Sequence, residues 1–331
     1  MRSIRKNFFF SSLCAPLLLS GLIGCKDRSI ETHASSTSAP VLRTTATVKL
    51  QMAADALPAE KTGGFDGAKA FNHVAKQVSF GPHPSGSQAI QQVQDYLQSE
   101  LTSYGCTFDI DAFSSDTPAG RLAMKNILVK IPGDNPGVLL LGTHYDTKRI
   151  DNFVGADDAG SSTAVMLELA RLLCSQHNKY AVWIAFFDGE EAVNLNWQDP
   201  DNRYGSREMA ARLSTSGDLP KVRAFLLADM VGGHNALFKR ETNSTKALVD
   251  LLWSTAARLG YTTVFANEAS AVEDDHLSFL SRHVPSVDVI GLDSAASYWH
   301  TPQDTLDKVS GKTLGITGHV FLESIKQLQT K

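Results

Sequence analysis

The chain has 331 residues, of which 43 % are apolar and 20 % are charged, as in an ordinary globular protein. This composition excludes a mostly disordered chain, a collagen-like rod and a membrane protein with several spans. The 31 basic and 35 acidic residues give a net charge of −4, and we expect no nucleic-acid partner because non-specific binding of nucleic acid needs a basic surface.

The first 24 residues have the pattern of a secretory signal peptide. Three basic residues precede an apolar run, residues 8–24, that is short and interrupted by Ser and Pro, so a spanning helix is disfavoured. The run ends in Leu22-Ile23-Gly24-Cys25, which resembles a bacterial lipobox, the motif whose Cys is lipidated and becomes the new N-terminus. We expect a lipid anchor at Cys25 and a location in the bacterial cell envelope. The alternatives are an ordinary signal peptide with an incidental Cys and an uncleaved anchor.

Residues 25–61 are expected to be a flexible tether, because Ser, Thr and Ala dominate and there is little periodicity. The remaining residues, 62–331, fit one large domain. Apart from Cys25, the mature chain would keep only Cys106 and Cys174, whose spacing gives no metal framework. These two are interpreted first as buried apolar residues and second as a disulfide formed in an oxidising compartment.

Within this domain, short apolar runs alternate with helical patterns. The expected strands are residues 138–143, 180–187, 224–228 and 286–290. The expected helices are residues 87–104, 159–176, 245–259 and 313–328. Buried strands that alternate with helices predict a three-layer α/β sandwich, with a mostly parallel central sheet flanked by helices on both faces.

Polar residues follow the expected strands where each strand ends, which is where open α/β sheets form their sites. They are His144 and Asp146, then Asp188, Glu190 and Glu191, then Asp229, and finally Trp299 and His300. Asp157 and Asp158 lie just ahead of an expected helix. Each residue alone could be a helix cap or a solvated surface group, but their recurrence at one edge of the sheet favours a site.

A cluster of Asp, Glu and His is a ligand set for a divalent ion such as zinc, whose catalytic sites use three protein ligands and an open position. In the adjacent pair Glu190 and Glu191, one carboxylate can bind the metal while the other acts as a general base. These residues indicate a metal-dependent hydrolase or transferase and name no substrate.

Three strings, residues 143–148, 155–160 and 186–192, resemble the zinc aminopeptidase superfamily, and within it the glutaminyl cyclase branch of animal type. Further matching motifs, in the same order along the chain, are residues 166–171, Trp197, residues 204–206, residues 273–276 and the pair Trp299-His300. Together the motifs run from about residue 71 to the C-terminus.

The resemblance implies one catalytic zinc ion held by Asp158, Glu191 and His300, with Glu190 as the proton carrier. His144 and Asp229 match positions that hold a second metal in the aminopeptidases, so a second zinc ion is not excluded.

The resemblance also implies a substrate pocket around these residues. Asp229 and Asp274 match carboxylates that surround the reacting amine, and Trp197 and Trp299 match residues that line the pocket. Glu273 stands where a Gln is usual.

The implied activity is that of a glutaminyl-peptide cyclotransferase, which converts the N-terminal Gln of peptides to pyroglutamate and releases ammonia. A two-zinc aminopeptidase of the same superfamily is the alternative, and a non-catalytic binding ectodomain is a weaker one because no ligand residue is missing. The sequence does not identify the peptide substrates, and a monomer is the default oligomeric state.

Overall fold

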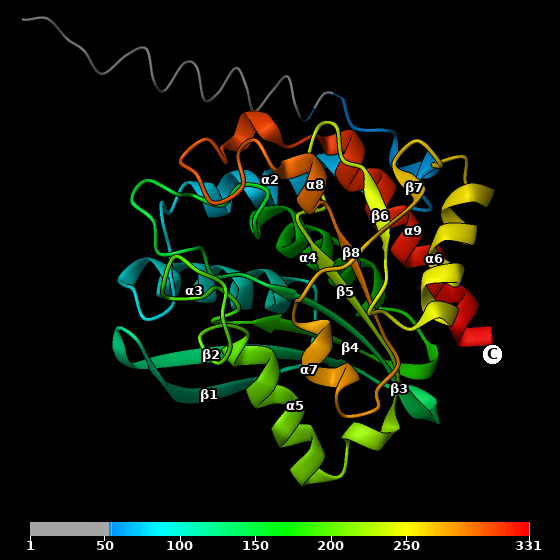
Figure 1. Cartoon of the computed structure of the whole chain (residues 1–331). Coiled ribbons are helices and arrows are strands. Elements are labelled where there is room, and N and C mark those ends of the chain that lie inside the picture. Colours follow the sequence, from blue (N-terminus) through cyan, green and yellow to red (C-terminus); the bar gives the residue numbers. More distant parts are fainter. Residues whose placement is uncertain (1–52, 54, 331) are drawn as a thin grey trace, which may run out of the picture. The chain divides into compact units, whose positions relative to one another are not determined.

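The computed structural model describes residue 53 and residues 55–330 (Figure 1). The expected signal peptide, Cys25 and most of the expected tether lie outside the described residues. The folded part begins before residue 62, because the Asp55 carboxylate accepts hydrogen bonds from the Ser310 hydroxyl at 2.6 Å and from the Lys312 N–H at 3.0 Å.

The centre of the domain is a six-stranded sheet in the order β1-β2-β4-β3-β5-β8 (Figure 1). Its strands are β1 Phe108–Thr117, β2 Gly120–Ile131, β3 Gly133–His144, β4 Asn178–Phe187, β5 Val222–Asp229 and β8 Ser286–Ile290. Neighbours among β4, β3, β5 and β8 pair in parallel, whereas β2 is antiparallel to both β4 and β1. The expectation of a mostly parallel sheet is therefore corrected to a mixed sheet. A short turn joins β1 to β2, and such a hairpin can only make antiparallel pairs.

Helices cover both faces of this sheet, as expected, and a small second sheet lies beside it (Figure 1). The helices are α2 Gly67–Val78, α3 Gln88–Ser103, α4 Gly160–Leu173, α5 Tyr204–Ser216, α6 Lys246–Arg258, α7 His276–Leu280, α8 Leu292–Ala295 and α9 Gly311–Thr330. The short 3₁₀ helices are η1 Ala59–Lys61, η2 Leu219–Lys221 and η3 Leu306–Lys308. Helices α2, α4 and α9 pack together on one face, and α5 and α7 pack on the other. Strands β6 Phe238–Glu241 and β7 Phe265–Ser270 form the small sheet.

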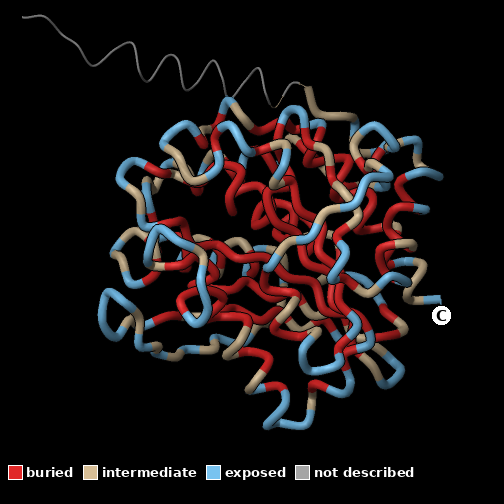
Figure 2. Tube along the Cα trace, viewed as in Figure 1, coloured by how far each residue is buried: buried red, intermediate tan, exposed pale blue. Residues whose placement is uncertain are grey.

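Two apolar cores hold the sheet between its helices. On β3, Leu139 and Leu141 belong to the core under α2, α4 and α9, whereas Leu140 belongs to the core under α5 and α7. Successive side chains of a strand point to opposite faces, so a strand covered on both faces is apolar without alternation. Figure 2 shows these strands as the buried centre of the domain. The rigid centre fixes where the strand ends place their polar residues.

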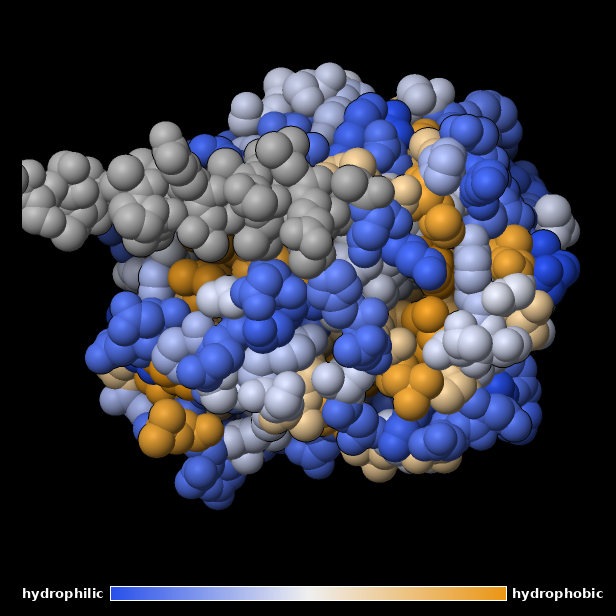
Figure 3. Space-filling model, turned by 90° about the horizontal axis from the view of Figure 1, so that it is seen from above, coloured by the Kyte–Doolittle hydropathy of each residue, from blue (hydrophilic) through white to orange (hydrophobic). Residues whose placement is uncertain are grey.

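The outer surface seen in Figure 3 is mainly hydrophilic, with hydrophobic residues in small separate groups. In the part of the chain that the structure describes, no helix is both long and apolar enough to cross a bilayer.

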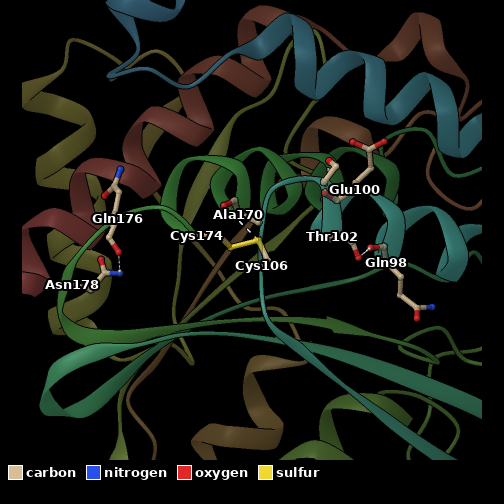
Figure 4. The surroundings of a disulfide bond; sticks show 9 residues. Gln98, Glu100, Thr102, Cys106, Ala170, Cys174, Gln176 and Asn178 are labelled. Carbon is tan, nitrogen blue, oxygen red and sulfur yellow. Dashed lines mark hydrogen bonds between the residues drawn. A yellow bond between two sulfur atoms is a disulfide. The ribbon is translucent and has the colours of Figure 1, made fainter.

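Cys106 and Cys174 form a disulfide, which settles the interpretation that the sequence left open (Figure 4). Cys106 follows α3, and Cys174 is the residue directly after α4. The bond therefore joins the ends of two helices that pack side by side, across 68 residues of sequence.

Replacing both cysteines by serine is expected to lower the free energy of unfolding by about 4 kcal/mol, because the bond restricts a long loop of the unfolded chain. The melting temperature should fall by roughly 8–16 °C, since a chain of this size loses about 2–4 °C per kcal/mol. Thermal unfolding of the double variant, and of the parent chain with and without reductant, measures this. A parent chain that melts at the same temperature in reductant would contradict the prediction.

Candidate metal and catalytic site

The ends of β3, β4 and β5 bring polar residues to one cavity of about 280 Å³. The residues that line it are Asp158, Glu190, Glu191, Trp197, Asp229, Met230, Ala271, Val272, Glu273, Asp274, Ile290, Leu292, Trp299 and His300. Eight of the nine predicted site residues are among them, and the ninth, His144, lies behind Asp158 and Asp229.

Asp158, Glu191 and His300 each offer one ligand atom, and these atoms lie within 4.8 Å of one another. The Nε2 atom of His300 is 3.1 Å from Glu191 Oε1 and 3.4 Å from Asp158 Oδ2. The three residues come from the loop before α4, the loop after β4 and the loop after α8, so only the folded chain assembles them.

A second group shares Asp158 with the first. His144, Asp158 and Asp229 also place ligand atoms within 4.8 Å of one another. The Nε2 atom of His144 is 3.2 Å from Asp158 Oδ1 and 3.1 Å from Asp229 Oδ1. The two carboxylate oxygens of Asp158 thus face different histidines.

The donor set suits a cation. Asp158 Oδ2 and Glu191 Oε2 are buried and accept no hydrogen bond from the described residues. Buried carboxylate oxygens without partners are costly, and a metal ion satisfies them. The buried Lys148 Nζ lies 3.5 Å from Glu191 Oε2 and balances part of the negative charge. Two carboxylates and one imidazole, with an open fourth side, match the ligand types of a catalytic zinc site.

Neighbouring carboxylates fix the loops that carry these ligands. Asp146 accepts the N–H of Glu190 at 3.0 Å and the N–H of Glu191 at 3.3 Å. Asp304 accepts the N–H of Asp157 at 2.9 Å and the N–H of Asp158 at 3.1 Å. Each carboxylate accepts two consecutive backbone N–H groups, so both loops are tied to the domain beside the residues that could bind an ion.

Close backbone approach explains one glycine of the string at residues 155–160. A Cβ on Gly155, whose φ is +57°, would lie 2.1 Å from the carbonyl oxygen of Asp158. Only glycine leaves room for this turn. His300 also has a left-handed backbone, with φ +51°, and its ring stacks on Trp299 with the ring centroids 4.1 Å apart.

Glu190 is buried beside the proposed metal ligands. Burial raises its pKa well above the usual value, and the charges of Glu191 and Asp274 raise it further, although His144 opposes them. The nearest atoms of Glu190 and His144, Oε2 and Nδ1, are 3.9 Å apart. A raised pKa makes the carboxyl group of Glu190 a stronger base, as a group that takes and returns a proton in the reaction must be.

Three further carboxylates in or beside the cavity are buried as well. Burial raises the pKa of Asp229 to about 6, although His144 opposes the shift, and burial followed by the charge of Asp229 raises that of Asp274 to about 7. Burial, followed by the charge of Asp274, raises the pKa of Asp275 to about 8. Like charges this close cannot all ionise cheaply, so the group holds protons at neutral pH.

Asp275→Asn is expected to reduce the loss of stability at alkaline pH. The folded chain binds a proton at Asp275 up to about pH 8, whereas an unfolded Asp releases it near pH 3.9. The contribution of this proton to the free energy of unfolding is therefore fully present below about pH 4 and is lost as the pH rises to about 8. Between pH 6 and 8.5 the melting temperature of the variant should fall by about 5–11 °C less than that of the parent, because the parent loses about 1.4 kcal/mol for each of the roughly two pH units up to pH 8. Equal losses in both chains would contradict the prediction.

Three strand-end residues from the sequence, His144, Asp146 and Asp188, do not line the cavity, and several lining residues were not predicted. Asp188 accepts hydrogen bonds from Ser85 at 2.5 Å and from the Lys125 N–H at 2.9 Å, so it ties neighbouring segments together. Asp146 supports Glu190 and Glu191 as described above. The unpredicted apolar lining is Met230, Ala271, Val272, Ile290 and Leu292. Of these, Met230 and Ile290 directly follow or end a strand, and that position was the available signal.

Comparison with known proteins agrees with this geometry. Residues 126–325 match the model of peptidase family M28. A glutaminyl cyclase structure from an Acidobacteriales bacterium is 38 % identical, with a TM-score of 0.76 over 80 % of this chain and 95 % of that one. A Zn-dependent exopeptidase structure from Parabacteroides distasonis is 30 % identical, with a TM-score of 0.72 over 79 % of this chain and 98 % of that one.

Among curated proteins, the glutaminyl-peptide cyclotransferase of Drosophila melanogaster is 28 % identical over 70 % of this chain and 73 % of its own length. Residues 126–325, which match the family model, include the strand ends and loops that carry Glu190, Glu191 and Asp229. The chain therefore belongs to peptidase family M28, and within that family to the glutaminyl cyclases.

Proposed function

We propose that this chain is a zinc-dependent glutaminyl-peptide cyclotransferase that converts the N-terminal Gln of peptides to pyroglutamate. The observation that carries the proposal is that Asp158, Glu191 and His300 converge in one cavity with Glu190 and with Trp197 and Trp299. The cavity therefore combines a ligand set, a proton carrier and aromatic walls. The cyclase names of the relatives support the same activity.

Asp158, Glu191 and His300 would hold one zinc ion. When bound, zinc acts as a Lewis acid that polarises a carbonyl group and stabilises negative charge on its oxygen. The partnerless oxygens of Asp158 and Glu191 support this ligand set, and Asp146 and Asp304 hold the ligand loops in place.

In the reaction the α-amine nitrogen of Gln attacks its own side-chain amide carbon. A ring C–N bond forms, the C–N bond to the amide nitrogen breaks, and ammonia leaves. The amine is mostly protonated at neutral pH, because its reference pKa is about 7.7–8.0. Glu190 would act on the neutral form of the amine: it would take the one proton that this nitrogen loses as the ring bond forms and give it to the departing nitrogen, which leaves as ammonia.

Asp229 and Asp274, which line the same cavity, would surround the amine. Their pKa values of about 6 and about 7 support a proton shared between them. The protonated carboxyl group can then donate a hydrogen bond and the ionised one can accept one. Trp197 and Trp299 would pack on the Gln side chain and exclude water. Water exclusion favours ring closure because no external nucleophile is needed.

A two-zinc aminopeptidase is the second candidate. His144, Asp158 and Asp229 form a complete second ligand group, and one similar structure is named a Zn-dependent exopeptidase. In that reaction water attacks the first peptide bond and a free amino acid is released. The two candidates thus differ in their products and in the number of zinc ions per chain.

Mass spectrometry of a Gln-initiated peptide tests both candidates directly. A cyclotransferase produces a peptide that has lost ammonia, whereas an aminopeptidase produces a peptide that has lost its first residue. Zinc should be measured on the same sample, with one ion per chain expected. Release of free Gln with two bound zinc ions would refute the proposal in favour of the aminopeptidase.

We further propose that Cys25 carries a lipid and anchors the enzyme in the bacterial cell envelope, on the basis of the lipobox-like residues 22–25. Cys25 lies outside the described residues. Fractionation of cells that express the parent chain or Cys25→Ser tests this, with the parent expected in the membrane fraction and the variant outside it. Recovery of both chains in the same fraction would refute the anchor.

A further inference from the structure

One wall of the cavity is a segment without regular secondary structure, residues 271–274, which we call the wall segment. It connects β7 to α7, and all four of its residues line the cavity. The last of them is Asp274. A segment outside helices and strands cannot fix its own backbone, so contacts from elsewhere must set the direction of the Asp274 carboxylate.

The first end of the wall segment is held from the end of β6. Glu241 is 2 % exposed, and its Oε1 atom accepts the N–H of Val272 at 3.1 Å and the N–H of Asn243 at 2.9 Å. The Asn243 side-chain amide donates to the carbonyl oxygen of Val272 at 3.0 Å. Both backbone polar groups of Val272 are therefore bound.

The second end is held by the same carboxylate. The Oε2 atom of Glu241 lies 3.3 Å from Nε2 of His276, the first residue of α7, and both side chains are inaccessible to solvent. Oε2 also accepts the N–H of Ser244 at 2.6 Å and its hydroxyl at 2.7 Å. Burial tends to raise the pKa of Glu241, but His276 and the backbone donors lower it to about 2, so Glu241 is ionised at any working pH.

A buried pair of this kind contributes little to stability relative to well-packed apolar side chains, because removing both partners from water is costly. Its geometric effect is more specific. Glu241 binds the wall segment at Val272 and again at His276, two residues beyond Asp274. Neither Glu241 nor His276 lines the cavity.

We propose that Glu241 and His276 form a clamp that positions Asp274 for the reaction without touching the substrate. They are positioning residues that act through Asp274. The inference depends on the proposed function, since it takes Asp274 to lie beside the reacting amine.

The test compares His276→Ala, His276→Gln and Asn243→Ala with the parent chain, each loaded with zinc. In His276→Ala we expect kcat for Gln cyclisation to fall on the order of 10²-fold, because a small misplacement of a reacting group lowers the rate by about this factor. KM should change by less than about threefold, because the Trp walls remain. His276→Gln keeps a donor toward Glu241 and should recover part of kcat. Asn243→Ala removes one anchor at an exposed residue, so it tests the clamp even if the His276 variants do not fold.

Zinc content and inhibition by imidazole, which competes by binding the metal, should be unchanged in all three variants. Glu168→Gln is the matched control: Glu168 is buried and paired with Arg171 on α4, outside the cavity. This control is expected to lower the melting temperature and leave kcat per zinc-loaded chain unchanged.

The clamp is refuted if His276→Ala and Asn243→Ala keep the parental kcat. It is equally refuted if Glu168→Gln lowers kcat as much as His276→Ala, because the effect would then be a general loss of rigidity. A failure of the proposed function is visible separately, since the unsubstituted chain would then release no ammonia from a Gln peptide.

Discussion

Replacing Glu190 by Gln is expected to lower kcat for Gln cyclisation by about 10³-fold while zinc remains bound. Proton transfer by a positioned side chain contributes roughly 10²–10⁴-fold to rate. Gln has nearly the same shape as Glu but cannot take a proton from the amine. Glu190 is also absent from both ligand groups, so the metal should keep its three ligands.

Steady-state kinetics on a Gln peptide, together with zinc analysis of the same preparation, measures this effect. KM should change little, because the aromatic walls and the metal ligands are untouched. Glu323→Gln is a suitable control, since Glu323 lies on α9 outside the cavity and pairs with Lys326. Near-parental turnover by Glu190→Gln with full zinc would show that another group carries the proton.

The second large effect is expected from His300→Ala, which removes one of three ligands. Loss of a residue that merely supports a ligand costs 10–100-fold in metal affinity, so loss of the ligand itself should cost more than about 10²-fold. Activity at limiting zinc should disappear with the metal. Because a bound ligand stabilises the folded chain less when its affinity is lower, the variant should also gain less stability from added zinc.

Competition against a zinc chelator gives the affinity, and melting temperature as a function of zinc concentration gives an independent measure. His177→Ala is the matched control, because His177 is exposed and pairs with Asp134 away from the cavity. If His300→Ala bound zinc as tightly as the parent, the ligand set would have to be revised toward His144, Asp158 and Asp229.

The central strands, which bury apolar residues on both faces of the sheet, and the helices with a buried apolar face were predictable from the sequence. Strands β3, β4, β5 and β8 and helices α3, α4, α6 and α9 all lie where apolar runs and helical periodicity indicate them. Strand β1 was missed because its side chains are largely accessible and charged residues interrupt it. Without β1 and β2 the antiparallel edge of the sheet could not be foreseen, and the sheet was predicted to be more parallel than it is.

The polar residues of the site could be predicted from the sequence. The buried residues that hold the loops of the site in place could not. Strand ends and the family resemblance indicated Asp158, Glu190, Glu191 and His300. Glu241 gave no such signal, because alone it is an ordinary polar residue at the end of a strand. His276 belongs to the matching motif at residues 273–276, but that motif indicated no partner for it. Their function depends on a contact across 35 residues of sequence, which local patterns do not contain.

Asp304 has a consequence for how the domain could release an ion. It lies four residues after His300, and its carboxylate grips the backbone of Asp157 and Asp158. Two proposed ligands that are far apart along the chain are thereby linked: a displacement of the loop bearing His300 and Asp304 would also break the hydrogen bonds that hold the backbone of Asp158. Local opening of that loop would displace two of the three proposed ligands at once. A bound metal ion should therefore be lost in a single step, and the rate of its loss should follow the rate at which this loop opens.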